Sequence, residues 1–225
     1  LAYRTPPVAT NPYRSMSPNT VSIVIPCYNE SATLETLVGK VLDADSLGLK
    51  KQVIIVDDGS DDDSHAKAKA LAETDPRIRV LKHPHNMGKG AALRTGFAEA
   101  NGQIVIVQDA DLEYNPAQFP KLLRPILEDH AEVVFGSRFI GSDSHRILYF
   151  WHSVGNKFLT LLSNIFTNLN LTDMEVCYKV FRKDVLDRLT LCENRFGIEP
   201  EITAKICRLR PRPAIYEVGL SYDGR

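Results

Sequence analysis

The feature that most constrains the fold is a regular alternation of short apolar runs with helical segments between residues 21 and 135. The apolar runs are rich in Val and Ile, which favours buried strands. Strands are predicted at 21–25, 52–56, 77–81, 103–107 and 132–135, and helices at 31–42, 61–74, 88–100 and 116–128. Because strand–helix–strand order makes successive strands parallel, the sequence predicts an α/β protein with a mostly parallel sheet and helices on both faces.

Two segments lie outside this alternation. Residues 1–20 contain four prolines and little that a core could bury, so we expect a tail followed by a single domain at 21–225. Between about 145 and 171, apolar residues recur at intervals of three and four, which predicts one long helix or two short ones. Core packing is the favoured interpretation of this stripe, and contact with a lipid chain or membrane interface is the alternative. Strands at 176–182 and 215–221 and a helix at 199–209 complete the prediction.

Composition excludes several classes of protein. The 225 residues are 44% hydrophobic and 24% charged, as in folded globular domains, and a net charge of -1 leaves no basic footprint for nucleic acid. Four cysteines without CxxC spacing disfavour a zinc site and a disulfide scaffold, and favour a reducing compartment. No apolar run approaches the ~20 residues that span a bilayer and no signal peptide is visible, so the chain is expected to be soluble.

Acidic residues follow two of the predicted strands. The carboxyl ends of parallel strands share one edge of a sheet, where ligands bind. Asp109 and Asp111 follow the fourth strand and would repel one another without a shared cation, so they are candidate ligands of Mg²⁺ or Mn²⁺; a helix-capping turn is the alternative. Asp57 and Asp58 follow the second strand and can accept hydrogen bonds from a base or ribose, while Gly59 permits a turn of positive φ; a turn with a helix cap is again the alternative.

Three cationic side chains are candidates for binding an anion. Lys89 lies in the glycine-rich segment 86–90 at a helix start, where free N–H groups can meet an anion. The segment lacks the Walker spacing, so no P-loop is predicted, and a solvated lysine in a glycine-rich connection is the alternative. Arg138 and Arg146 follow the fifth strand and suit bidentate contact with phosphate, or else form surface salt bridges.

Two acidic residues follow the helical stripe. Asp173 or Glu175 is a candidate general base, or else either one holds a helix end or pairs with Lys179. The histidines have no spacing typical of a metal site and are interpreted as structural; they include His83, His85 and His152.

Five motifs, in this order, resemble family 2 glycosyltransferases of the GT-A fold, and within that family the polyprenyl-phosphate (dolichyl-phosphate) hexose synthases. They are Val24 to Glu30, Val56 to Ser60, Asn86 to Gly90, Asp109 to Glu113, and Gly136 to Arg138. The resemblance covers about Val21 to Arg225, and the ordered combination is far more specific than any single motif. It implies a GT-A fold, in which the helical segment at about 145–171 lies on the acceptor side.

The resemblance also implies roles for individual residues. Asp109, Asp111 and Glu113 would bind Mg²⁺ or Mn²⁺ and the sugar diphosphate, and Arg138 and Arg146 would contact phosphates. The nucleotide would be held by Pro26, Tyr28, Glu30 and Asp57, which join Asp58, Lys89 and Asp109 as candidate nucleotide-binding residues. The third metal position is often Gln in the mannosyl enzymes, so Glu113 departs from the family pattern. Its extra charge would tighten metal binding or change sugar preference.

These features predict an inverting, metal-dependent enzyme that transfers a hexose from a nucleotide sugar, of the GDP-mannose or UDP-glucose type, to a polyprenyl or dolichyl phosphate. Such an enzyme would act peripherally at the cytoplasmic face of a membrane. A phosphate acceptor is already an anion and needs no strong base, whereas a sugar hydroxyl needs one, and Asp173 is then the candidate. A non-catalytic nucleotide-sugar-binding module is a second class. A nucleotidyltransferase would require a glycine-rich basic signature where this chain has Pro26 to Glu30.

Overall fold

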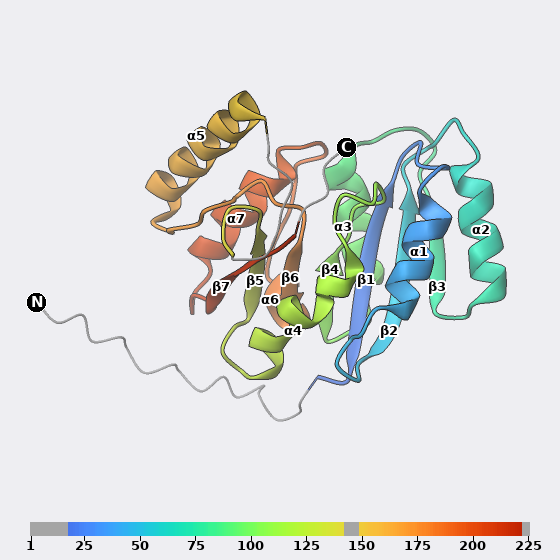
Figure 1. The fold of residues 1–225 in the computed structure, drawn as a ribbon, viewed down its shortest axis with the longest axis horizontal. Helices are drawn as coiled ribbons and strands as arrows, with labels where there is room; N and C mark the ends of the chain where they lie inside the picture. Colours follow the sequence, from blue (N-terminus) through green and yellow to red (C-terminus); the bar gives the residue numbers. More distant parts are fainter. Residues whose placement is uncertain (1–17, 142–148, 222–225) are drawn as a thin grey trace, which may run out of the picture.

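One seven-stranded sheet organises the chain in the computed structural model, which describes residues 18–141 and 149–221 (Figure 1). In sequence order the strands are β1 (Thr20–Cys27), β2 (Lys50–Asp57), β3 (Ile78–Lys82), β4 (Ile104–Val107), β5 (Val133–Ser137), β6 (Lys179–Arg182) and β7 (Ile215–Gly219). The order across the sheet is β3-β2-β1-β4-β6-β5-β7. Only β6 is antiparallel to its neighbours, so the prediction of a mostly parallel α/β sheet is confirmed.

Helices cover both faces of this sheet (Figure 1). They are α1 (Leu34–Asp43), α2 (Ser64–Thr74), α3 (Lys89–Glu99), the 3₁₀ turn η1 (Pro116–Gln118), α4 (Phe119–Leu127), α5 (Phe150–Thr167), α6 (Lys183–Leu186) and α7 (Ile198–Arg208). In α4, Phe119 packs on Tyr178 just before β6, whereas Phe97 of α3 packs on Phe181 from the opposite face. Helix α6 was not predicted, because four residues are too few to show a helical period.

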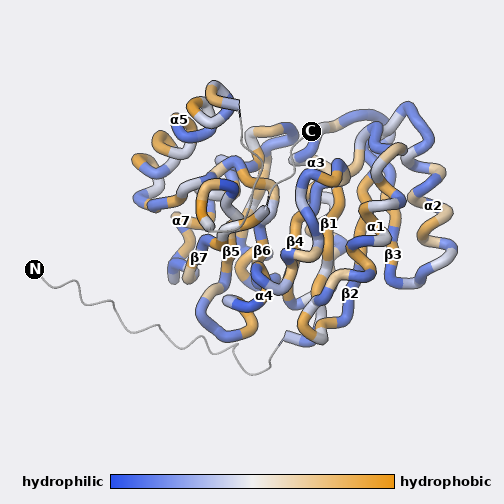
Figure 2. The backbone as a smooth tube through the Cα atoms, in the orientation of Figure 1, coloured by the Kyte–Doolittle hydropathy of each residue, from blue (hydrophilic) through white to orange (hydrophobic). Residues whose placement is uncertain are grey.

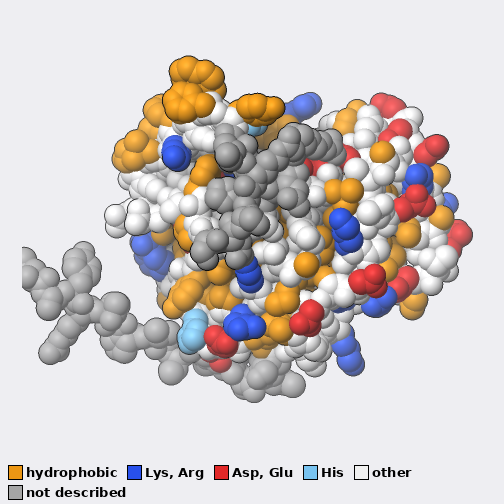
Figure 3. Space-filling view, viewed as in Figure 1, with side chains coloured by type: hydrophobic (Ala, Val, Ile, Leu, Met, Phe, Trp, Pro, Cys, Tyr) orange, Lys and Arg blue, Asp and Glu red, His pale blue; other side chains and the backbone are white. Residues whose placement is uncertain are grey.

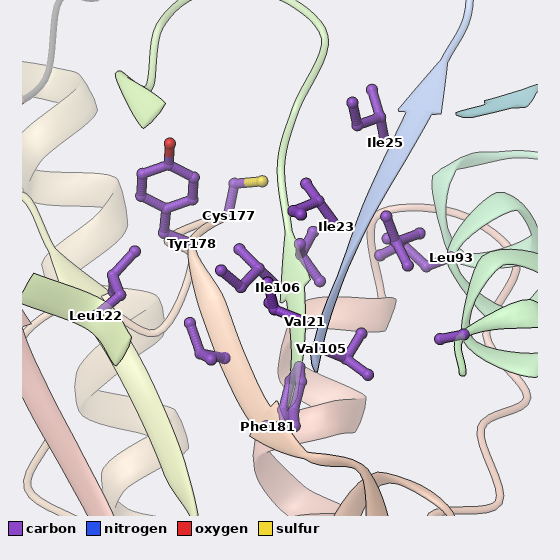
Figure 4. Close-up of a cluster of buried hydrophobic side chains, with 14 of the residues drawn as sticks. Val21, Ile23, Ile25, Leu93, Val105, Ile106, Leu122, Cys177, Tyr178 and Phe181 are labelled. Atoms are coloured by element: carbon purple, nitrogen blue, oxygen red, sulfur yellow. The ribbon is translucent and has the colours of Figure 1, made fainter. Parts of the chain in front are cut away.

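The central strands are apolar without interruption because helices cover both of their faces. All four residues of β4 are buried, and the same holds for Ile23 to Ile25 of β1. Figure 4 shows Ile106 and Val105 on opposite sides of β4, with Ile23 and Phe181 among the other buried side chains of the core. The β-branched runs noted in the sequence therefore form the core.

The antiparallel strand β6 has a geometric consequence for the site. Because β6 runs opposite to both β4 and β5, these two strands run in the same direction. Strands β1 and β2 are parallel to β4, so the carboxyl ends of all four strands lie at one edge of the sheet. The segments that follow Cys27, Asp57, Val107 and Ser137 therefore meet at this edge, as the sequence predicted.

Helix α5 reverses the usual amphipathic arrangement. Its aromatic and aliphatic side chains face solvent, with Trp151 79% exposed, Phe166 85% and Ile165 64%. The buried positions of the helix are Thr160 and Thr167. Figure 3 shows hydrophobic side chains gathered on the outer surface of α5, and the tube in Figure 2 shows hydrophobic and hydrophilic residues alternating along this helix. The favoured expectation that this stripe packs into the core is therefore wrong.

Polar side chains hold α5 against the rest of the domain. Asn164 makes two hydrogen bonds to the backbone of Leu171, with its Nδ2 2.8 Å from the carbonyl oxygen and its Oδ1 3.0 Å from the amide nitrogen. The hydroxyl of Thr160 accepts from the amide of Met174 at 3.1 Å. Periodicity alone shows that a helix has two faces but not which face meets the protein. In the described part of the chain, no helix combines the length and apolar character needed to cross a membrane.

Candidate active site

A pocket of about 420 Å³ opens at the carboxyl edge of the sheet. It brings together segments that follow β1, β2 and β4 with a loop that precedes α7. The lining residues are Pro26, Cys27, Tyr28, Glu30, Asp58, Asn86, Gly88, Lys89, Ala92, Asp109, Ala110, Asp111, Arg195 and Phe196. Seven of the candidate nucleotide or metal residues from the sequence therefore share one cavity: Pro26, Tyr28, Glu30, Asp58, Lys89, Asp109 and Asp111.

Lys89 neutralises Asp109 at the pocket wall. Its Nζ lies 2.9 Å from Oδ1 and 3.1 Å from Oδ2 of Asp109, and 3.4 Å from Oε1 of Glu199. Burial works to lower the pKa of Lys89, but the charges of Asp109 and Glu199 outweigh it, so this pKa lies well above its usual value. Lys89 is therefore a charged, largely buried side chain rather than the solvated lysine that was the alternative.

The row of alternating charges continues into the core. Oε2 of Glu199 accepts a hydrogen bond from Nζ of Lys179, a side chain that is fully buried in β6. Lys179 also donates to the backbone carbonyl of Met174 at 3.2 Å. Asp109, Lys89, Glu199 and Lys179 thus form a chain of ion pairs that runs from the pocket wall into the core, which we call the charge row. Lys179 pairs with Glu199 rather than with Asp173 or Glu175, which corrects one of the pairings considered from sequence.

The loop after β4 carries the three predicted metal ligands. Asp109 and Asp111 line the pocket, and their carboxylate oxygens are hard donors of the kind that Mg²⁺ and Mn²⁺ accept. Glu113 does not line it; its amide donates to Oδ1 of Asp111 at 3.1 Å. Within residues 18–141 and 149–221, no three His, Cys, Asp or Glu side chains are grouped so that they could hold a metal ion alone. The two aspartates fit a cation that takes its remaining ligands from substrate phosphates.

Asp58 organises the glycine-rich segment beside the pocket. Its carboxylate accepts hydrogen bonds from the amides of Met87 at 3.0 Å and Gly88 at 2.7 Å, and lies 2.6 Å from Nδ1 of His83. These contacts fix segment 86–90 against the end of β2. The interpretation of His83 as structural is confirmed, and the carboxylate of Asp58 is already engaged by the protein.

Asp57 lies below the pocket lining and is fully buried. Its Oδ1 accepts from the amide of Ser60 at 3.1 Å, whereas its Oδ2 has no hydrogen-bond partner in the described part of the chain and lies 3.4 Å from Nδ1 of His65. A buried acceptor without a donor is compatible with the predicted contact to a nucleotide. The turn prediction is confirmed at Gly59, whose φ is +72° and where a Cβ would lie 2.5 Å from the backbone of His85.

Arg138 and Asp173 form a buried ion pair near α5. Nε and Nη2 of Arg138 lie 2.7 Å and 2.8 Å from the two carboxylate oxygens of Asp173, and the backbone amide of Arg138 adds a contact of 3.0 Å. Asn156 of α5 also donates to Asp173, at 3.3 Å. This arrangement orients the guanidinium and engages both carboxylate oxygens, so in this structure Asp173 positions Arg138.

A second cavity, of about 310 Å³, lies between Arg138 and α5. It includes Trp151 and Glu175 in its wall. Burial and then the charge of Glu199 raise the pKa of Glu175, and Lys179 partly offsets them. Arg146, the other predicted phosphate contact, lies outside the described residues. The donor and acceptor candidates therefore line separate cavities on the same side of the molecule.

Arg195, Phe196 and Glu199 reach the site from the C-terminal part of the chain and were missed by the sequence analysis. They belong to a polar loop and the first turn of α7, segments without a recognisable motif. A polar stretch before a helix is common to most loops, so it offered no specific signal. Their place in the site follows from contacts of the loop before α7 with Arg94 and Ala91 of α3, and of Glu199 with Lys89.

Comparison with known proteins identifies relatives of this chain. The family model described as "Glycosyl transferase family 2" matches residues 22–190. The chain is 30% identical over 191 residues to an undecaprenyl-phosphate 4-deoxy-4-formamido-L-arabinose transferase of Aeromonas hydrophila, covering 84% of this chain and 56% of that protein. It is 30% identical over 187 residues to a dolichol-phosphate mannosyltransferase of Pyrococcus furiosus, covering 82% and 52%. The chain thus spans just over half the length of these relatives.

The same fold occurs in a solved structure. Glucosyl-3-phosphoglycerate synthase from Mycobacterium tuberculosis, crystallised with Mn²⁺, uridine diphosphate and glucosyl-3-phosphoglycerate, superposes with a TM-score of 0.70 at 24% identity. The match covers 92% of this chain and 73% of that one. At this identity the likeness establishes the GT-A fold, in agreement with the fold predicted from the motifs.

Proposed function

Because this chain belongs to glycosyl transferase family 2, we propose that its site transfers a hexose from a nucleotide sugar, of the GDP-mannose or UDP-glucose type, to a polyprenyl or dolichyl phosphate. The names of two relatives support a lipid-phosphate acceptor, although the chain spans only about half of each. The observation that carries the acceptor class is the outward apolar face of α5 beside the cavity that contains Arg138.

The donor is assigned to the 420 Å³ pocket. Tyr28 is 41% exposed there and offers a ring to the nucleotide. Asp57, the predicted contact for a base or ribose, is buried outside the pocket lining, and its Oδ2 accepts no hydrogen bond from the described residues. Mg²⁺ or Mn²⁺, when held by Asp109 and Asp111 with Glu113 as the predicted third ligand, supplies positive charge to the departing nucleoside diphosphate. Lys89 holds the carboxylate of Asp109 in a fixed direction before the donor arrives.

The acceptor is assigned to the 310 Å³ cavity. Arg138 is held there by Asp173, so its guanidinium is oriented before a phosphate binds. A phosphate monoester is an anion at neutral pH and attacks the anomeric carbon without a strong base, so orientation and electrostatics supply most of the rate. Attack opposite the leaving diphosphate inverts the anomeric centre.

The outer face of α5 is assigned to the membrane surface at the cytoplasmic side. Phe150 and Trp151 at its start and Phe166 near its end are each at least 70% exposed. An amphipathic helix with such a face lies in the interface of a bilayer with its apolar side chains among the acyl chains. A polyprenyl chain would occupy the same apolar layer as it enters the cavity beside Trp151.

No observation favours the alternative acceptor, a sugar hydroxyl with Asp173 as base. Both oxygens of Asp173 are engaged by Arg138, and Asp173→Asn would also loosen that arginine. The substitution therefore does not separate the two acceptor classes. A non-catalytic binding module is likewise unsupported, since every acidic position that the motifs require is present.

The deciding experiment screens donors against acceptors. GDP-mannose and UDP-glucose are each incubated with Mn²⁺ or Mg²⁺ and with either polyprenyl phosphate in vesicles or a soluble oligosaccharide, and labelled product is counted. We expect label only in the lipid, with an anomeric configuration by NMR opposite to that of the donor. Label in the oligosaccharide alone would contradict the proposed lipid-phosphate acceptor. The absence of label with every donor–acceptor pair would contradict the proposed transferase activity.

A matched pair of variants tests the role of α5. Phe166→Ser should lower transfer to long-chain polyprenyl phosphate in vesicles but not to a short, soluble phosphate analogue, because only the former needs the membrane. Tyr216→Ser, which alters an exposed aromatic residue on the edge strand β7, should change neither. Equal transfer by Phe166→Ser and the unmodified protein in vesicles would contradict the membrane assignment.

A further inference from the structure

The loop at 192–197 is fixed firmly to helix α3. Arg94 of that helix donates to the carbonyl oxygens of Cys192 at 2.7 Å and Glu193 at 2.6 Å, and to Oδ1 of Asn194 at 2.6 Å. The carbonyl of Asn194 accepts a further hydrogen bond from the amide of Ala91 at 3.0 Å. These four contacts join the loop to the N-terminal half of α3.

This contact requires glycine at both glycine positions of segment 86–90. A Cβ on Gly88, whose φ is +100°, would lie 2.4 Å from the carbonyl oxygen of Asn194, and a Cβ on Gly90 would lie 2.3 Å from that of Glu193. Both distances are far below any real Cβ contact, and the partners are backbone atoms that cannot move aside. Because Gly88 and Gly90 have no side chains, the backbone of the loop can lie directly against the glycine-rich segment.

The contact between the loop and the glycine-rich segment places Arg195 at the donor pocket. A Cβ on Gly88 would lie 2.8 Å from Cγ of Arg195, so the aliphatic part of the arginine passes directly over the glycine. Arg195 lines the same cavity as Asp109 and Asp111. In contrast to Lys89 and Arg138, its guanidinium has no carboxylate or hydrogen-bond partner among the described residues.

We infer that Arg195 binds the diphosphate of the nucleotide sugar, and that Arg94 positions it by holding the loop; this inference rests on the proposed function. Lys89, the other cation in the lining of this pocket, is already compensated by Asp109, and Arg138 in the acceptor cavity is compensated by Asp173. Arg195 is the cation whose charge is free to meet the diphosphate. An arginine offers that ligand two parallel hydrogen bonds, which a lysine cannot.

Nucleotide binding tests the inference without measuring turnover. Affinities of Arg195→Gln for GDP and UDP are compared with those for guanosine and uridine, by competition in the presence of Mn²⁺. We expect the affinity for the preferred diphosphate to fall about tenfold or more, since hydrogen bonds between charged groups are lost, while nucleoside affinity stays the same. Arg208→Gln, an exposed arginine of α7 outside the pocket, is the matched control and should change neither affinity.

The possible results separate this inference from the proposed function. If the unmodified protein binds a diphosphate and Arg195→Gln binds it equally well, the inference is overturned and the proposed function stands. If nucleoside and diphosphate affinities fall together, Arg195 shapes the pocket and does not bind the diphosphate, which also overturns the inference. If the unmodified protein binds neither diphosphate, both proposals fail.

A double-mutant cycle tests the positioning role of Arg94. Arg94→Ala should weaken diphosphate binding in the unmodified background, because it releases three contacts to the loop. In the Arg195→Gln background, Arg94→Ala should cause little further loss of diphosphate affinity, because no guanidinium remains at position 195 to be positioned. Equal losses in the two backgrounds, with both variants folded by circular dichroism, would show that Arg94 does not act through Arg195.

Discussion

The donor side and the acceptor side of this molecule use charge and apolar surface in opposite ways. On the donor side, the ion pairs of the charge row extend from Asp109 at the pocket wall to Lys179 in the core. Around α5, polar groups also point inward, but the apolar side chains face solvent. A site for a diphosphate needs fixed charges in a medium of low dielectric constant, whereas a surface for a lipid needs exposed apolar area.

The comparison also shows where each side obtains its stability. The donor side rests on strands that are buried on both faces, so it can accommodate buried ions. Helix α5 buries little apolar surface and is held by hydrogen bonds of Asn156, Thr160 and Asn164. Each difference can be tested by substitution.

The largest effect is expected at Asp109. Asp109→Ala should abolish nucleoside diphosphate binding that depends on a divalent cation, because it removes a predicted metal ligand and the nearer of the two carboxylates that contact Lys89. Titration calorimetry with Mn²⁺ measures this affinity, and thermal unfolding checks that the variant is folded. Unchanged affinity would contradict the assignment of the donor pocket.

Next in size is the inner end of the charge row. Lys179→Met should lower the free energy of unfolding by about 3–5 kcal/mol, because Glu199 loses its buried partner. Lys183→Met breaks the pair with Asp187, whose side chain is 57% exposed, and should cost less than about 1 kcal/mol. Urea denaturation of both variants measures the difference. Equal costs would show that the charge row does not stabilise the donor side.

A smaller effect is expected when the two faces of α5 are compared. Asn164→Ala should cost about 1–3 kcal/mol, because the backbone of Leu171 loses both hydrogen bonds. Phe166→Ala should change the free energy of unfolding by less than about 0.5 kcal/mol, because the ring is 85% exposed. The opposite ranking in chemical denaturation would mean that the apolar face packs against protein.

The smallest effect concerns how the stability contributed by Glu217 depends on pH. The carboxylate of Glu217 accepts hydrogen bonds from the backbone amides of Thr172 at 2.8 Å and Asp173 at 3.1 Å. Burial raises the pKa of Glu217 above its ordinary 4.5, and these hydrogen bonds lower it only in part. Its protonated form is therefore favoured by folding, a contribution that is present below pH 4.5 and is lost as pH rises through the folded-state pKa.

Glu217→Gln should remove this pH dependence, so that the variant gains stability relative to the unmodified protein as pH rises from about 4.5 to neutrality. Urea denaturation at several pH values measures the relative gain. Glu73→Gln, at an exposed position of α2, is the control for removal of a surface carboxylate. A difference between Glu217→Gln and the unmodified protein that is constant with pH would contradict the expectation.

Much of the fold followed from local sequence. Strands that are buried on both faces must be apolar throughout, so β1, β2 and β4 were visible as Val- and Ile-rich runs, and their boundaries shifted by only a few residues. Lys89, Asp109 and Asp111 were found because they follow a strand or begin a helix, positions that the α/β order brings to one edge. Pro26, Tyr28 and Glu30 were named because of the family resemblance.

Three features depended on contacts between distant segments. The orientation of α5 was misjudged because a helical period is the same whether the apolar face turns inward or outward. Glu199 and Arg195 have no local motif, and only the tertiary contacts of the loop at 192–197 with α3, and of Glu199 with Lys89, bring them to the site. The sequence by itself determined the sheet and the acidic edge, because backbone and burial preferences act over a few residues. The tertiary structure alone decided which charges are paired and which face of α5 is exposed, because pairing and burial depend on residues far apart in the chain.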